Sequence, residues 1–309
     1  MVQIVDKKVL SSDGVHQLVG KVYIPEGDIK GLFQVVHGMI EHIERYHDFM
    51  QEVAENGYIV FAYDQLGHGH TAVDRSELGF IAHENGWKHL VDDVNRFAEE
   101  VREEYGSQLP YYLMGHSMGS FIVRLTAEKF DMNDKLIIMG TSGPNPAAQP
   151  GIAAIKLVKK TKGERYYSKF LENLAFGTYN KKFGNDDPLN WISSIKEERD
   201  KYRNDPLHDF HFTASAMEDL LHLSQECNTK RWFSSRVTKK PILLISGADD
   251  PVGNYGKGVK AVHDKLKANG ADVKFKLYAN ARHEILNDIC AKKVKKDILE
   301  FIAKEYRKH

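Results

Sequence analysis

This sequence has few of the features that mark secreted, membrane-spanning or nucleic-acid-binding proteins. Its 309 residues contain only two cysteines, too few and too far apart to suggest a disulfide framework or a metal knuckle, so we expect buried free thiols. Lysine plus arginine and aspartate plus glutamate balance at 43 each, so no overall charge favours nucleic acid as a partner. The amino-terminal stretch lacks the layout of a signal peptide, and no apolar run is long enough to span a bilayer. We therefore expect a soluble, cytoplasmic protein.

What the sequence does contain is a repeated order of apolar strands and amphipathic helices. With 42% hydrophobic and 28% charged residues, the composition is that of a globular protein. The predicted strands are Gln3–Leu10, His16–Ile24, Gly31–Val36, Tyr58–Tyr63, a short one from Tyr111, Lys135–Met139, Lys240–Ser246 and Val273–Tyr278. The predicted helices include Tyr46–Ala54, Trp87–Val101, Gly256–Ala268 and Ala291 to about Tyr306. This order indicates an α/β fold whose mostly parallel central sheet carries helices on both faces.

One long segment interrupts the alternation. From residue 144 to residue 237, prolines, glycines and lysines are interleaved with aromatic residues, and helical stripes replace strands. We expect this segment to be a helical cap inserted into a core made of residues 1–143 and 238–309. The stripes are Tyr167, Phe170, Leu171 and Leu174, and then Met217, Leu220, Leu221 and Ser224.

The turn around Ser117 is the strongest candidate for chemistry. An apolar strand enters Gly115-His-Ser-Met-Gly119 and an amphipathic helix leaves it, which is the context in which a Gly-x-Ser-x-Gly turn presents a nucleophilic serine. Gly115 and Gly119 allow strand and helix to approach closely without Cβ atoms. A serine that merely caps the helix is the ordinary alternative.

A nucleophilic serine needs a base and a group that orients the base, and each should follow a parallel strand. His283 follows the strand that ends at Tyr278, and Asp249 and Asp250 follow the strand that ends at Ser246. The chain order serine, acid, histidine is that of the α/β-hydrolase arrangement. Asp250 is favoured because Pro251 restricts its backbone, and Asp249 stays as the alternative acid.

Two backbone N–H groups are candidates for stabilising the negative charge that develops on a substrate carbonyl oxygen. Met118 follows the serine at the start of a helix, and Met39 follows His37-Gly38 after a strand. His37 and His116 lie inside glycine-containing turns, where we expect them to shape the backbone rather than to carry protons.

Five segments together resemble the monoacylglycerol lipase and lysophospholipase group of α/β-hydrolases, which includes serine aminopeptidase S33-type enzymes. They are His37-Gly-Met-Ile-Glu-His-Ile-Glu-Arg-Tyr46, Asp64-Gln-Leu-Gly-His-Gly-His-Thr71, Gly115-His-Ser-Met-Gly119, Gly247-Ala-Asp-Asp-Pro-Val252 and His283-Glu284. The resemblance implies an α/β-hydrolase fold, a triad of Ser117, Asp250 and His283, and oxyanion donors at Met39 and Met118.

The expected activity is cofactor-free and metal-free hydrolysis of carboxylic esters of small lipids, of monoacylglycerol or lysophospholipid type, through an acyl-enzyme. A peptidase or amidase of the same fold, and a non-catalytic ligand-binding protein, are the alternatives. Cap residues that could line an acyl pocket are Ile152, Ile155, Phe176, Trp191, Ile192, Phe210, Phe212 and Leu220. Lysines between 156 and 169 allow at most a transient membrane-surface contact, and no obligate protein partner is evident.

Overall fold

A computed structural model describes residues 1–184 and 186–304 of the chain. In this part of the chain the strands form one eight-stranded sheet in the spatial order β1-β2-β4-β3-β5-β6-β7-β8. β2 pairs antiparallel with β1 and β4, and all other neighbours pair parallel. The strands are β1 (Val2–Leu10), β2 (Gln17–Pro25), β3 (Gly31–Val36), β4 (Tyr58–Tyr63), β5 (Tyr111–His116), β6 (Lys135–Met139), β7 (Ile242–Gly247) and β8 (Val273–Tyr278). The predicted mostly parallel sheet is confirmed.

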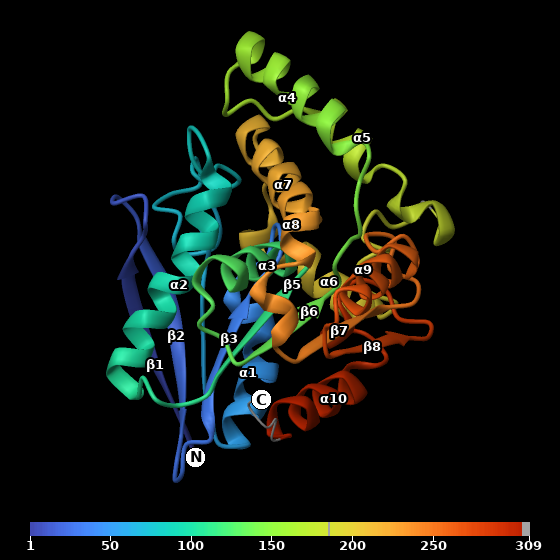
Figure 1. Ribbon diagram of the computed structural model, residues 1–309. Helices are drawn as coiled ribbons and strands as arrows, with labels where there is room; N and C mark the ends of the chain where they lie inside the picture. The colour runs from blue at the N-terminus through green and yellow to red at the C-terminus, as the bar shows by residue number, and fades with distance from the viewer. Residues whose placement is uncertain (185, 305–309) are drawn as a thin grey trace.

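Helices cover both faces of the sheet, as predicted (Figure 1). Helices α1 (His47–Glu55) and α10 (Ala291–Ala303) pack on one face, and α2 (Gly86–Tyr105), α3 (Met118–Phe130) and α9 (Lys257–Ala268) pack on the other. Alternate residues of the central strands enter the two cores: in β6, Leu136 and Ile138 face one, and Ile137 and Met139 face the other. The last helix was predicted to reach about Tyr306, which lies outside the described residues.

The segment between β6 and β7 contains helices and no strand among its described residues. Figure 1 shows α4, α5 and α7 grouped beyond one edge of the sheet. The helices are α4 (Ala148–Lys162), α5 (Lys169–Phe176), α6 (Lys196–Asn204), α7 (Ala214–Glu226) and α8 (Lys230–Phe233). Of the first predicted stripe, Leu171 is buried, Phe170 and Leu174 are exposed, and Tyr167 precedes α5. The cap boundaries 144–237 remain our proposal.

Both cysteines are free, and their burial differs from the expectation in one case. Cys227 is buried, as expected, whereas Cys290 is only partly buried at the start of α10. None of the helices in the described part of the chain has the length and apolar character that crossing a bilayer requires.

The backbone of the turn that connects β5 to α3 packs directly against the backbone at the end of β3. A Cβ atom on Gly115 would lie 2.2 Å from the carbonyl oxygen of Gly119, and one on Gly119 would lie 2.2 Å from that of Val36. Real Cβ atoms do not approach carbonyl oxygens so closely, so both positions require glycine. The expected steric role of the two glycines is confirmed, and the turn at residue 117 lies beside the loop that follows β3.

Replacing Gly119 by alanine should therefore destabilise the protein, although alanine is the better helix former. The clash is with the carbonyl oxygens of Val36 and His37, which cannot rotate away, and we expect a loss of at least about 2 kcal/mol of unfolding free energy. Urea unfolding followed by circular dichroism measures this loss.

Gly151→Ala in α4 is the matched control, because the new Cβ would meet only the tip of the Leu221 side chain. We expect this variant to stay within about 1 kcal/mol of the wild type. A Gly119→Ala protein as stable as the control would show that the turn is less tightly packed than the structure indicates.

Candidate active site

Three parallel strands bring the predicted triad to one edge of the sheet. Ser117 follows the carboxyl end of β5, Asp250 follows β7, and His283 follows β8. Because neighbouring parallel strands end on the same side, side chains that follow them lie close together although 166 positions separate Ser117 from His283 in the sequence.

Ser117 occupies a backbone conformation that non-glycine residues rarely adopt. Its φ is 53° and its ψ is −120°, and its N–H donates to the carbonyl oxygen of Met139 at 3.0 Å. Such strain costs on the order of 1–3 kcal/mol and persists only where the surroundings enforce it. Here the packed glycine turn enforces it, and the half-buried Ser117 side chain reaches the cavity described below.

The His283 imidazole is held by Asp250. Its Nδ1 lies 2.9 Å from Oδ2 of Asp250, and both side chains are buried. The same carboxylate accepts hydrogen bonds from the Ser246 hydroxyl at 3.2 Å and the Val252 N–H at 2.9 Å, so both of its oxygens accept hydrogen bonds. An Nδ1–H that donates to this carboxylate leaves Nε2 of His283 with the lone pair that a general base needs.

The structure also shows which of the two adjacent aspartates contacts the histidine. The Asp249 side chain forms an ion pair with Lys182 of the cap segment and makes no hydrogen bond or ion pair with the imidazole. Asp250 is therefore the carboxylate next to the histidine, which agrees with the preference expressed from the sequence. The catalytic roles of Ser117, Asp250 and His283 remain predictions.

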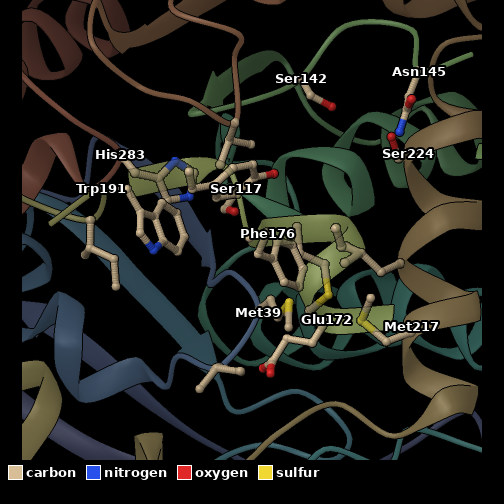
Figure 2. A pocket seen from close by; sticks show the side chains of 18 of the residues that line it. Met39, Ser117, Ser142, Asn145, Glu172, Phe176, Trp191, Met217, Ser224 and His283 are labelled. Carbon is tan, nitrogen blue, oxygen red and sulfur yellow. The ribbon is translucent and has the colours of Figure 1, made fainter. Parts of the chain in front are cut away.

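Figure 2 shows Ser117 and His283 side by side at the wall of one cavity, with the indole of Trp191 against the imidazole. The Trp191 and His283 ring centroids are 5.1 Å apart. The backbone N–H of His283 donates to the carbonyl oxygen of Trp191 at 3.3 Å. No hydrogen bond joins the hydroxyl of Ser117 to the imidazole among the described residues. Catalytic hydrogen bonds often tighten only when substrate binds, and rotation about χ1 moves the serine oxygen.

Both predicted oxyanion donors line the cavity beside Ser117. Met118 is the first residue of α3, so its N–H has no acceptor within the helix. The N–H of Met39 has no backbone or side-chain acceptor in the described part of the chain. Two such groups near a serine suit the stabilisation of an oxyanion. Their role stays a prediction.

His37 explains how the Met39 peptide is held. Its Nε2 accepts the N–H of Gln65 at 3.0 Å, so the neutral ring carries its proton on Nδ1 and donates it to the carbonyl oxygen of Gly38 at 2.8 Å. Burial lowers the pKa of His37 and favours this neutral form. Since the Gly38 carbonyl and the Met39 N–H belong to one planar trans peptide and point in opposite directions, His37 orients the candidate donor.

The cavity has a volume of about 1160 Å³ and lies between the sheet edge and the cap. Five of the cap residues predicted to line a pocket do so: Phe176, Trp191, Ile192, Phe210 and Leu220. The prediction is wrong for Ile152 and Ile155, which are buried within α4, and for Phe212, which packs in the core and outside this cavity. The apolar character of these residues predicts burial but does not show whether they contact the cavity or the core.

One group in the described part of the chain has a composition that could bind a metal ion. His42, Asp205 and His208 each offer a ligand atom within 4.8 Å of the others. However, Nε2 of His42 lies 2.8 Å from Oδ2 of Asp205, so the two side chains hydrogen bond directly and link the core to the cap. The expected absence of a metal ion stays a prediction.

Comparisons with known proteins agree with the geometry. A family described as "Serine aminopeptidase, S33" matches residues 27–289. Monoacylglycerol lipase of Mycolicibacterium smegmatis is 26% identical over 300 residues, with 94% of each chain covered. Human monoglyceride lipase is 28% identical over 283 residues, which cover 91% of this chain and 84% of that protein. A carboxyl esterase from Bacillus coagulans, solved in complex with glycerol, superimposes with a TM-score of 0.91 at 30% identity over 98% of both chains.

Sequence reasoning missed Glu41 and the contacts of His116. Glu41 lines the cavity and His116 is buried behind it, with Oε1 of Glu41 and Nδ1 of His116 3.0 Å apart. Both lie inside segments that were identified as motifs, so the signal was present. Their pairing joins residues 75 positions apart, which local patterns do not reveal.

The two aspartates offer a direct test of the proposed geometry. Asp250→Asn should lower kcat/KM for a p-nitrophenyl ester by on the order of 10³-fold or more, because an amide cannot hold the imidazole in the required tautomer. Asp249→Asn, which breaks only the ion pair with Lys182, should change kcat/KM by less than about threefold. Similar losses in both variants, measured on protein with wild-type circular dichroism, would argue against the assignment of Asp250.

Proposed function

Because this chain belongs to the serine aminopeptidase S33 family of α/β-hydrolases, we propose that it hydrolyses carboxylic esters of small lipids through an acyl-enzyme on Ser117. Its relatives named monoacylglycerol lipase and carboxyl esterase support an ester hydrolase. The observation that carries the proposal is the strained Ser117 turn beside the bonded His283 and Asp250 pair, on the wall of a cavity with a largely apolar lining.

The proposed reaction has two halves. Nε2 of His283 takes the proton of Ser117 as Oγ attacks the ester carbonyl, and the N–H groups of Met39 and Met118 stabilise the oxyanion. The tetrahedral intermediate expels the alcohol, which receives the proton from His283, and the acyl group stays on Ser117. His283 then deprotonates a water molecule that attacks the acyl-enzyme, and it returns this proton to Oγ of Ser117 as the carboxylic acid is released.

The cavity suits an acyl lipid better than a small polar ester. Its volume slightly exceeds the roughly 300–1,000 Å³ of ordinary ligand pockets, so an extended chain can be enclosed. Apolar residues of α3, α5 and α7 form one part of its wall: Phe121, Leu174, Phe176, Met217, Leu220 and Leu221. Ser142, Asn145 and Ser224 supply polar groups on another part (Figure 2). Monoacylglycerols and lysophospholipids combine an apolar acyl chain with a polar head group, and we propose one of them as the substrate class.

The carboxylates of the cavity wall argue against the rival aminopeptidase activity. A carboxylate without another partner is the group that binds the α-ammonium of an aminopeptidase substrate most strongly. Glu41 is bonded to His116, Glu172 to His211, and Glu284 to Arg45. Each lining glutamate in the described part of the chain therefore already has a partner.

We propose that the cap makes at most transient contact with a lipid surface. Leu157 of α4 and Phe170 of α5 expose 64% and 70% of their surface, close in sequence to the predicted lysine stretch. Exposed apolar side chains beside cations favour such contact. The cytoplasmic location and the absence of a cofactor, of nucleic acid and of an obligate protein partner stay predictions from the sequence.

The decisive variant is Ser117→Ala, because it removes only the nucleophilic oxygen. We expect kcat for monoacylglycerol and p-nitrophenyl esters to fall by on the order of 10⁴-fold or more, with the melting temperature unchanged because alanine meets the same backbone strain at this position. Release of free acid and of p-nitrophenol measures the turnover.

A substrate panel with matched acyl chains separates the alternatives. Monoacylglycerols, lysophospholipids and aminoacyl amides of graded chain length should show turnover of the esters and little of the amides. Undiminished ester turnover by Ser117→Ala would contradict the proposal, and so would a wild-type enzyme that cleaves only amides. A wild-type protein that turns over none of these substrates would favour a non-catalytic ligand-binding protein.

A further inference from the structure

A buried pair of charged side chains lies directly behind the candidate active site. Oε1 of Glu41, in the loop after β3, lies 3.0 Å from Nδ1 of His116, the residue before Ser117. Both side chains are almost completely buried. Burying a carboxylate is costly unless hydrogen bonds and an opposite charge compensate, so the surroundings of the pair need an explanation.

Glu41 is hydrogen bonded from three directions. Besides His116, its Oε2 accepts the N–H of Gly38 at 2.7 Å and the hydroxyl of Tyr46 at 2.5 Å. These bonds hold the pKa of the carboxyl well below its usual range, although burial alone would raise it. The Gly38 bond is the important one, because the next peptide carries the N–H of Met39. Glu41 thus holds the N–H of Gly38, and His37 holds the carbonyl oxygen of the same residue.

His116 reaches in the opposite direction, toward the base. Its Nε2 lies 3.3 Å from the carbonyl oxygen of His283, and the two imidazole rings have centroids 4.7 Å apart. Both ring nitrogens of His116 face acceptors, which favours the doubly protonated ring. Burial alone would lower the pKa of His116, but the Glu41 carboxylate outweighs it and raises the pKa to about 8.

The pair therefore touches each of the three segments that the reaction needs. Glu41 bonds the loop of the oxyanion donor, His116 belongs to the nucleophile turn, and its Nε2 bonds the backbone of the base. A Cβ atom on Gly38 would lie 2.9 Å from Cβ of Ser117, so the first two segments are also in close contact. A shift of the pair would move the groups relative to one another.

We propose that Glu41 and His116 form a positioning pair, which holds the Met39 loop, the Ser117 turn and the His283 backbone in the relative arrangement that ester hydrolysis requires. The inference rests on the proposed function and deepens it. Neither side chain exchanges a proton with substrate. Their contribution lies in geometry, where a misplacement of about 1 Å can cost on the order of 10²-fold in rate.

Glu41→Gln tests the proposal because it removes the charge and keeps the shape. We expect kcat per titrated active site to fall about 10- to 100-fold, with KM within about threefold of the wild type, because the acyl chain still binds the same cavity wall. Active sites are counted by stoichiometric phosphonylation, so loss of folded protein does not enter kcat.

The pH profile supplies a readout that loss of stability would not change. The positive charge on His116 is present below its pKa and is lost as the pH rises through about 8. Wild-type kcat should therefore decline in that range, and Glu41→Gln, which lacks the partner carboxylate, should not show this decline. The titratable groups that face His116 are Glu41, Tyr46, His283 and Glu284.

Glu44→Gln is the matched control. Glu44 lies three positions after Glu41 in the same segment, but its side chain pairs with Lys21 at the surface and does not line the cavity. We expect its kcat to stay within about twofold of the wild type.

If Glu41→Gln does not fold, Tyr46→Phe replaces it, since this change removes one hydrogen bond from Glu41 and keeps the ion pair. We expect kcat to fall about 3- to 10-fold. Unchanged kcat per active site in the folded variant, with only a lower melting temperature, would overturn the positioning role. Absence of ester turnover by the wild-type protein would instead overturn the proposed function itself.

Discussion

The close contact between the Ser117 turn and the end of strand β3 determines the geometry of the whole candidate site. Because no Cβ atom fits at Gly115 or Gly119, helix α3 begins almost against the backbone of Val36 and His37. This contact forces Ser117 into its strained conformation and places the first N–H of α3 near the loop of Met39. The His283 and Asp250 side chains lie at the same edge because β7 and β8 run parallel to β5.

The segment between β6 and β7 lines the cavity and also forms hydrogen bonds to the loop that carries His283. The carbonyl oxygen of Trp191 accepts the backbone N–H of His283, and that of Ile192 accepts the backbone N–H of Glu284 at 2.8 Å, so the loop of His283 is bonded to the backbone of the segment between β6 and β7. His42 and Asp205 make a second link between core and cap. The apolar wall of the cavity comes from α3 and the cap helices together. The apolar wall of the cavity and the position of the His283 loop thus depend on the same segment.

The sequence was sufficient to predict the fold and to propose Ser117, Asp250 and His283 as a candidate triad, because both rest on local patterns. Apolar runs bounded by turns predicted every strand within two residues of its observed ends or, for β5, its start at Tyr111. The sequence was insufficient wherever contacts between residues far apart in the chain determine where a side chain lies. Of the adjacent Asp249 and Asp250, the first pairs with Lys182 and the second with His283, and these partners lie far away in the sequence. Ile152 and Phe212 are as apolar as Phe176, yet they pack away from the cavity.

The most direct test of the central claim is to identify the residue that a fluorophosphonate modifies. After inactivation of the wild-type protein, proteolysis and mass spectrometry should place a single adduct on Ser117, with ester hydrolysis lost in proportion to the fraction labelled. An adduct on a different residue at complete inactivation, or full modification of Ser117 with ester hydrolysis retained, would contradict this account of the site.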